Sequence, residues 1–188
     1  GYHCTRLTDD ERASIMTAGF HALSPALIER RVRAQVASGA LSARLAQSIL
    51  TTHQGAVQGR TGMLWFIFHR GTLANRSGVV RLFRSWGGEA VYWSREGGPE
   101  GAQLRRLGAP CIVVAAVPVR SIRTFHDPGR RFVIQYLASC GVDVPDDPEW
   151  EGNIRHDLAS DDMLRIIPFA DPEFLQLTKS SDWADEIA

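Results

Sequence analysis

The chain has 188 residues, of which 44% are hydrophobic, and its 21 basic residues balance 21 acidic ones. This size and composition predict one globular domain spanning residues 1–188 and argue against a disordered chain. No apolar run approaches the ~20 residues of a membrane-spanning helix, and the N-terminus lacks the layout of a signal peptide. We therefore expect no membrane association and a cytoplasmic location.

Cysteine and histidine spacing predicts neither a disulfide framework nor a metal site. Cys4, Cys111 and Cys140 are odd in number, widely spaced and without a C-x-x-C pair. The six histidines lack the H-x-x-x-H spacing of a helical metal site. Cys111 and Cys140 lie in apolar stretches, where a thiol usually fills space.

Charge is distributed unevenly along the chain. Residues 12–135 hold 17 arginines and five carboxylates, whereas residues 136–188 hold 13 carboxylates and three basic residues. Arginine suits bidentate contacts to phosphate and carboxylate groups. The basic segment therefore favours a phosphate-bearing ligand or nucleic acid, or else the acidic C-terminal third packs against it.

The N-terminal third begins with a short predicted strand and continues as helices. Residues 2–6 are aromatic, β-branched or bulky, and on a strand His3 and Thr5 share one face. These two polar side chains either form hydrogen bonds inside the protein or contact a ligand. The three N-caps expected for the helices that follow are Thr8, which pairs with Glu11 in a capping box, Ser24 before Pro25, and Ser42.

Beyond residue 62 the pattern changes to strands separated by short helices. Strands are predicted at residues 63–69 (buried on both faces), 86–94, 109–119 and 163–169, and helices near residues 79–83, 99–107 and 128–140. On the second of these strands, Tyr92 and Trp93 would alternate between the core and the outside. The fold class predicted is α+β, with a helical N-terminal third followed by a mixed, split β-sheet.

Two common catalytic arrangements are disfavoured by the sequence. His3 and Cys4 are neighbours on a strand and point to opposite faces, which does not suit a cysteine nucleophile and its base. His156 and Asp157 resemble a His–Asp pair, but the chain has no G-x-S-x-G serine to complete it. Glu89 is expected to form an ion pair with one of the many arginines.

Three segments in chain order carry a family resemblance. The chain opens with Tyr-His-x-Thr, followed by a helix ending IMTAGF; EAVYWS then precedes a helix and CIVVAAVPV; finally comes WEGNIRHDLASDDMLRIIPF. In this order they resemble the H-G-[ST] strand, the G-I-Y strand and the glutamate-bearing strand of ADP-ribosyltransferases of the diphtheria-toxin and poly-ADP-ribose-polymerase type. The resemblance implies a split sheet around an NAD cleft.

The resemblance also implies roles for individual residues. His3 would hydrogen-bond a ribose of NAD, with Thr5 beside it, and Tyr92 would line the nicotinamide pocket. Cys4 stands where the family has glycine, and its backbone would bind the nicotinamide amide. Glu151 would be the catalytic carboxylate, because breaking the glycosidic bond develops positive charge on the ribose. Glu149 competes with Glu151 for that place.

The implied activity is that of a mono-ADP-ribosyltransferase, such as a bacterial toxin or defence protein. It would cleave NAD and transfer ADP-ribose to a macromolecular acceptor, either protein or nucleic acid. One alternative is a catalytically inactive binding module of the same fold, which recognises a protein or nucleic acid through its arginines. Another is an enzyme similar to the 2′-phosphotransferases that act on RNA ends.

Overall fold

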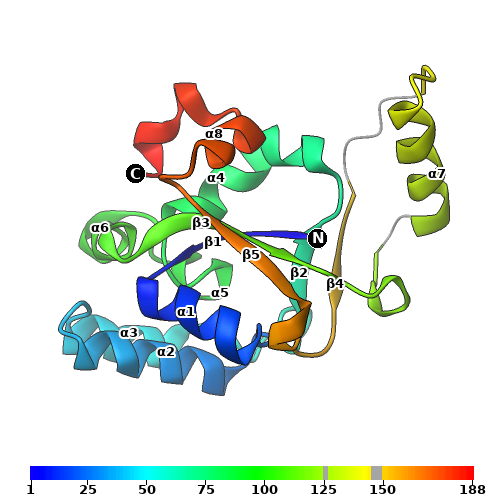
Figure 1. The fold of residues 1–188 in the computed structure, drawn as a ribbon. Coiled ribbons are helices and arrows are strands. Elements are labelled where there is room, and N and C mark those ends of the chain that lie inside the picture. Colours follow the sequence, from blue (N-terminus) through cyan, green and yellow to red (C-terminus); the bar gives the residue numbers. More distant parts are fainter. Residues whose placement is uncertain (125–126, 145–149) are drawn as a thin grey trace.

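A five-stranded antiparallel sheet forms the centre of the protein (Figure 1), with strand order β4-β2-β1-β3-β5. The computed structural model describes residues 1–124, 127–144 and 150–188, with 50% helix and 17% strand, which confirms the α+β class. The strands are β1 (Tyr2–Leu7), β2 (Leu64–Ile67), β3 (Ala109–Ala115), β4 (Glu151–Ile154) and β5 (Met163–Pro168).

The direction of the strands differs from the expected mixed sheet. β1 lies between β2 and β3 and runs antiparallel to both, and the outer strands β4 and β5 reverse direction again. In a mixed sheet, some neighbouring strands are parallel and are joined by helical crossovers. In this sheet every pair of neighbouring strands is antiparallel. The prediction of a mixed sheet is wrong.

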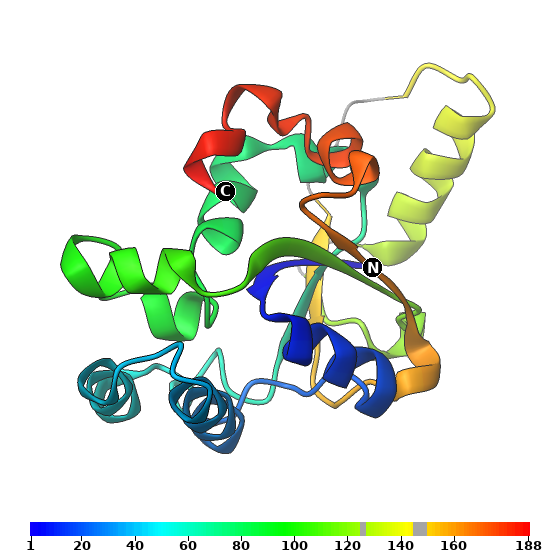
Figure 2. The same ribbon diagram turned by 60° about the vertical axis from the view of Figure 1, so that its left-hand side comes forward.

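The helices pack on both faces of the sheet and form a separate layer beside it (Figures 1 and 2). One core lies between the sheet, α4 and α8, a second lies between the sheet and α1, and a third joins α2 and α3 to α5 and α6. The helices are α1 (Asp9–Ala18), α2 (Pro25–Ala37), α3 (Ala43–Thr52), α4 (Arg76–Arg84), α5 (Glu89–Tyr92), α6 (Gly98–Arg106), α7 (Pro128–Ser139) and α8 (Pro172–Thr178).

The expected N-caps are confirmed. Thr8 and Glu11 form the complete capping box of α1, and the side chains of Ser24 and Ser42 each accept a hydrogen bond from the third backbone N–H of their helix. Asp127 caps α7 in the same manner, accepting from the backbone N–H groups of its first turn. These helices start where a local side chain satisfies N–H groups that have no partner inside the helix.

Two expected strands are corrected. Residues 86–94 contain the single helical turn α5 in place of a strand, because Gly87 and Gly88 adopt positive φ angles of 94° and 70° that redirect the chain. The strand expected over residues 63–69 is shorter and is not buried on both faces, since Trp65 is 39% exposed. In the described part of the chain, no helix is both long and apolar enough to cross a membrane.

Candidate functional site

The sheet is split between β1 and β2. β1 pairs with β3 along its whole length, from Tyr2 to Leu7, but it is in register with β2 at only one position, where Tyr2 faces Ile67. Figure 1 shows the two strands diverging from this point near the N-terminus. We call the region beyond the Tyr2–Ile67 pair the split; it begins beside His3.

The backbone of Cys4 faces the split. Gly1 and Ala115 exchange both backbone hydrogen bonds, at 2.8 and 3.0 Å, so they form a hydrogen-bonded pair of the β1–β3 ladder. In an antiparallel ladder the residues alternate, so His3 and Thr5 also direct their N–H and C=O groups at β3. Cys4 directs its N–H and C=O groups to the other side, where no residue of β2 is in register with it.

The side chain of His3 closes the start of the split. Its Nδ1 lies 2.7 Å from the carbonyl oxygen of Trp65, and its ring packs against Phe20 and Phe66, with centroids 4.8 and 6.0 Å away. A carbonyl oxygen only accepts, so Nδ1 carries the proton, and the neutral imidazole keeps Nε2 as an acceptor. Burial lowers the pKa of His3 to about 4, so the ring is neutral at pH 7.

Thr5 points to the same face as His3 and is only 6% exposed. No hydrogen bond between described residues uses its hydroxyl group. The sequence left open whether these two side chains form hydrogen bonds inside the protein or contact a ligand. His3 bonds inside the protein through one ring nitrogen, whereas the hydroxyl of Thr5 remains available to another partner. Three consecutive residues therefore present an imidazole acceptor, a backbone donor–acceptor pair and a hydroxyl group at or beside the split.

A charged cluster joins α1 to α2 through Glu11 and Arg31. Arg31 Nε donates to Glu11 Oε1 at 2.7 Å, and Trp86 Nε1 donates to both oxygens of Glu11, at 2.9 and 3.1 Å. The guanidinium lies over the Trp86 ring, 4.8 Å from its centroid. Burial tends to raise the pKa of Glu11, but the charge and hydrogen bond of Arg31 outweigh it and hold that pKa below its usual value. The sequence signal at Glu11 was the capping box alone, and it did not point to Arg31 or Trp86.

Tyr92 is not brought to His3. It lies on α5, is 2% exposed and belongs to the core formed with α2, α3 and α6. Its ring contacts the guanidinium of Arg81, 5.9 Å away, and burial raises the pKa of its hydroxyl. Among described residues, no hydrogen bond or ring contact joins Tyr92 to His3. Trp93, the next residue, is 49% exposed and has Arg60 and Arg81 over its ring.

Glu151 begins β4, as the resemblance implies, and its side chain is exposed. In the sheet register, Glu151 faces Ile67 and Ile67 faces Tyr2, so these three side chains share one face. His3 packs against Phe66, which lies on the other face. The structure thus places His3 and Glu151 on opposite faces of the sheet, two strands apart. Glu149 lies outside the described residues.

A second histidine forms the His–Asp pair that the sequence suggested for His156. His21 Nδ1 lies 2.8 Å from Asp157 Oδ2, and the N–H of Ala22 donates to Asp157 Oδ1 at 2.7 Å. His156 instead contacts the backbone carbonyl of Asp157. The pair lines a cavity of about 330 Å³, where the hydroxyl of Ser24 is used as the cap of α2. Among the described residues no hydrogen bond joins Ser24 to His21, so this pair does not activate the serine.

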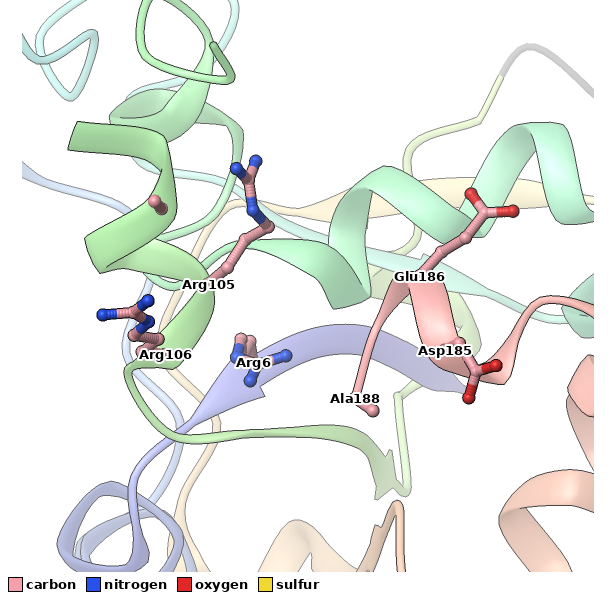
Figure 3. A pocket seen from close by; sticks show the side chains of 7 residues that line it. Arg6, Arg105, Arg106, Asp185, Glu186 and Ala188 are labelled. Carbon is pink, nitrogen blue, oxygen red and sulfur yellow. The ribbon is translucent and has the colours of Figure 1, made fainter. Parts of the chain in front are cut away.

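A larger cavity, of about 590 Å³, lies between α6 and the C-terminal residues (Figure 3). Arg105 and Arg106 line one side of it, and Asp185 and Glu186 line the other. The guanidinium of Arg6 donates to the carbonyl oxygens of Leu107, Phe83 and Ile187, at 3.1, 3.3 and 2.6 Å. These bonds make Arg6 a structural connection, since its Nε and Nη1 groups donate within the protein.

The two buried thiols do not offer a nucleophile. Cys4 and Cys111 are buried and free, and burial raises the pKa of both, in Cys111 to about 11, so they stay protonated at neutral pH. Cys140 is free and exposed, so the expectation of an apolar environment for it is wrong. In the described part of the chain, no three His, Cys, Asp or Glu side chains are placed to hold a metal ion.

The chain matches no protein-family model, no curated protein and no solved structure. The resemblance to ADP-ribosyltransferases thus rests on the order of the motifs in the sequence.

Proposed function

We propose that the protein is a mono-ADP-ribosyltransferase-like enzyme that binds NAD at the split between β1 and β2. The observation that carries the proposal is the set of uncommitted polar groups on three consecutive residues: Nε2 of His3, the backbone of Cys4 and the hydroxyl of Thr5. A protein core normally satisfies such groups internally. Left open together on one strand, they are suited to a ligand.

The three groups fit the chemistry of the nicotinamide riboside half of NAD. A carboxamide carries a donor and an acceptor, and the backbone of Cys4 offers one of each. Nε2 of the neutral His3 ring accepts from a ribose hydroxyl. The reaction then breaks the ribose–nicotinamide bond, nicotinamide leaves with the bonding electron pair, and the acceptor nucleophile bonds to the ribose carbon and loses a proton to solvent.

The position of Glu151, the expected catalytic carboxylate, is the feature that fits transfer of ADP-ribose least well. Glu151 has the charge to stabilise an oxocarbenium-like ribose, but it lies on the sheet face opposite His3. Catalysis by Glu151 requires the start of β4 to shift so that the carboxylate reaches the ligand. The observed placement favours a second candidate function, a module of the same fold that binds the dinucleotide without transferring ADP-ribose.

Calorimetry with NAD and a nicotinamide-release assay separate the two functions. We expect the wild-type protein to bind NAD, and His3→Ala to weaken binding by roughly 1–3 kcal/mol, since a ligand hydroxyl loses its acceptor. His156→Ala, an exposed histidine outside the split, is the matched control and should bind normally. A folded wild-type protein that does not bind NAD would contradict both functions.

The role of Glu151 is tested in the same assay. Glu151→Gln keeps the size of the side chain and removes its charge, so binding should persist while turnover falls about 10²-fold, the scale of losing one preorganised electrostatic group. NAD binding without nicotinamide release in the wild type would establish the binding module instead.

The acceptor is a protein or a nucleic acid, and the arginine surplus makes the distinction measurable. If the acceptor is nucleic acid, its affinity should fall steeply with salt concentration, in proportion to the number of phosphates neutralised. Affinity that stays constant from low to high salt would indicate a protein acceptor.

A further inference from the structure

Arg6 is a buried arginine without a carboxylate partner. The residue is only 4% exposed, and among the described residues no carboxylate forms an ion pair with it. The groups that accept from its Nε and Nη1 are the backbone carbonyl oxygens of Leu107, Phe83 and Ile187, which carry no net charge. Buried charges in proteins are normally paired with an opposite charge. The guanidinium of Arg6 is therefore a place where an anion is stabilised.

The remaining donor group of Arg6 opens into the larger cavity described above (Figure 3). Nη2 forms no hydrogen bond with a described residue, and it is not closed off from solvent. Arg6 is one of the residues that line this cavity, and Figure 3 shows its guanidinium between the α6 side and the C-terminal side. The cavity volume of about 590 Å³ is typical of small-molecule sites, which span roughly 300–1,000 Å³.

The walls of the cavity carry an excess of positive charge. Arg105 and Arg106 reach it from the last turn of α6, and neither forms an ion pair with a described carboxylate. Glu186 lies on the opposite wall, but its carboxylate is already paired with Arg76 and Arg84, which do not line the cavity. Three arginines thus face the cavity with their charges unbalanced.

This arrangement fits a phosphate group better than a carboxylate. A phosphate ester carries a charge of about −1.5 to −2 at pH 7 and three strong acceptor oxygens, whereas a carboxylate has one charge and two oxygens. Arginine binds phosphate oxygens through directed N–H groups. The opposite wall adds the exposed carboxylate of Asp185, which repels a phosphate but accepts hydrogen bonds from hydroxyl groups.

We propose that this cavity binds a small phosphate ester with hydroxyl groups, such as a sugar phosphate, whose phosphate contacts Arg6, Arg105 and Arg106. The hydroxyl groups of the ligand then face Asp185. The site is separate from the split, because the side chain of Arg6 lies on the face of β1 opposite to His3 and Thr5. The inference therefore does not depend on the proposed function.

Calorimetry compares glucose 6-phosphate, inorganic phosphate and glucose as ligands of the whole chain. We expect glucose 6-phosphate to bind more tightly than inorganic phosphate, and glucose not to bind measurably. Arg6→Gln should lower the affinity for glucose 6-phosphate about 10-fold or more, because a charged donor is lost. Arg106→Gln removes an exposed arginine of the cavity and should lower it about 3-fold. Arg120→Gln is the matched control: this exposed arginine follows β3, lies outside the cavity and should leave binding unchanged.

Two further variants keep the test independent of the structural role of Arg6. Asp185→Asn removes a negative charge from the cavity, so the affinity for inorganic phosphate should rise about 2-fold or more. His3→Ala should bind glucose 6-phosphate with unchanged affinity, because His3 belongs to the split. A fall in that affinity would contradict the separation of the two sites.

Other outcomes overturn the inference outright. A folded wild-type protein that binds neither glucose 6-phosphate nor inorganic phosphate has no phosphate site. Equal losses in Arg106→Gln and Arg120→Gln would show that phosphate is attracted only by the surface charge of the protein. If inorganic phosphate binds as tightly as glucose 6-phosphate, the cavity does not recognise the hydroxyl-bearing part of the ester. None of these results bears on binding of NAD at the split.

Discussion

A single hydrogen bond determines the chemistry of His3. Because Nδ1 donates to the carbonyl of Trp65, the opposite ring nitrogen, Nε2, is an acceptor at neutral pH. The surrounding rings of Phe20 and Phe66 disfavour the charged form. His3 is thus suited to accepting a hydroxyl proton in a hydrogen bond and is unsuited to binding a phosphate.

The low pKa of His3 predicts a loss of stability in mild acid. The pKa falls from 6.5 to about 4 on folding, so between these values the unfolded chain binds a proton that the folded protein does not. The stabilising contribution of neutral His3 is fully present above pH 6.5 and is lost as the pH falls toward 4. Urea unfolding from pH 7.5 to 5 should show a steeper decline in the free energy of unfolding for the wild type than for His3→Gln. Parallel curves for the two proteins would contradict the assigned pKa.

At the scale of elements, the turn before α5 decides where Tyr92 and Trp86 lie. Gly87 has a φ of 94°, and a Cβ atom there would lie 2.6 Å from the Cβ of Val91. Gly88 also has a positive φ, of 70°, but a Cβ atom there would meet nothing within 4 Å. A side chain at Gly88 would therefore introduce backbone strain alone, whereas a side chain at Gly87 would introduce both backbone strain and steric overlap.

The two alanine variants should differ in stability. Gly88→Ala adds backbone strain alone and should cost about 1 kcal/mol, whereas Gly87→Ala adds an overlap with α5 and should cost about 3 kcal/mol or more. Thermal or urea unfolding measures both values. Equal losses would mean that α5 moves freely to accept the new methyl group.

Local sequence signals predict some elements of this fold and leave others undecided. N-caps at Thr8, Ser24 and Ser42 are local signals, and the helices start where these residues predict. The apolar run after Gly88 fits a buried strand or a buried helical turn equally well, and its length alone does not distinguish them. The direction of strand pairing depends on contacts between distant residues, which no local pattern contains.

At the scale of the whole molecule, the candidate site divides into a part that the sequence reveals and a part that it hides. His3, Cys4 and Thr5 are consecutive on a strand, so one short motif identifies them. Glu11 on α1, Arg31 on α2 and Trp86 between α4 and α5 are far apart in the sequence and meet only in the folded protein. Whether His3 and Glu151 meet depends on strand register, because a shift by one residue moves a side chain to the other face.

Helix α7 stands apart from the rest of the molecule in both views (Figures 1 and 2). Arg131 is its one buried residue, while Val133 and Tyr136 are 58% and 68% exposed. Because most of its residues are exposed, α7 should open locally at a lower free energy than the central strands. Hydrogen exchange should be on the order of 100-fold faster for amides in α7 than for amides in β3. Comparable protection in the two elements would show that α7 unfolds only with the whole domain.

Arg6 contacts a segment of the chain that is synthesised much later than β1. Its guanidinium joins β1, at the beginning of the chain, to the carbonyl oxygen of Ile187. The β3 strand that pairs with β1 is made a hundred residues later, and β5, beside β3, is later still. On the ribosome, β1 therefore emerges long before its partners, with apolar residues and backbone groups uncovered. Such a nascent chain is exposed to misfolding and is expected to benefit from chaperones until β3, β5 and Ile187 have emerged.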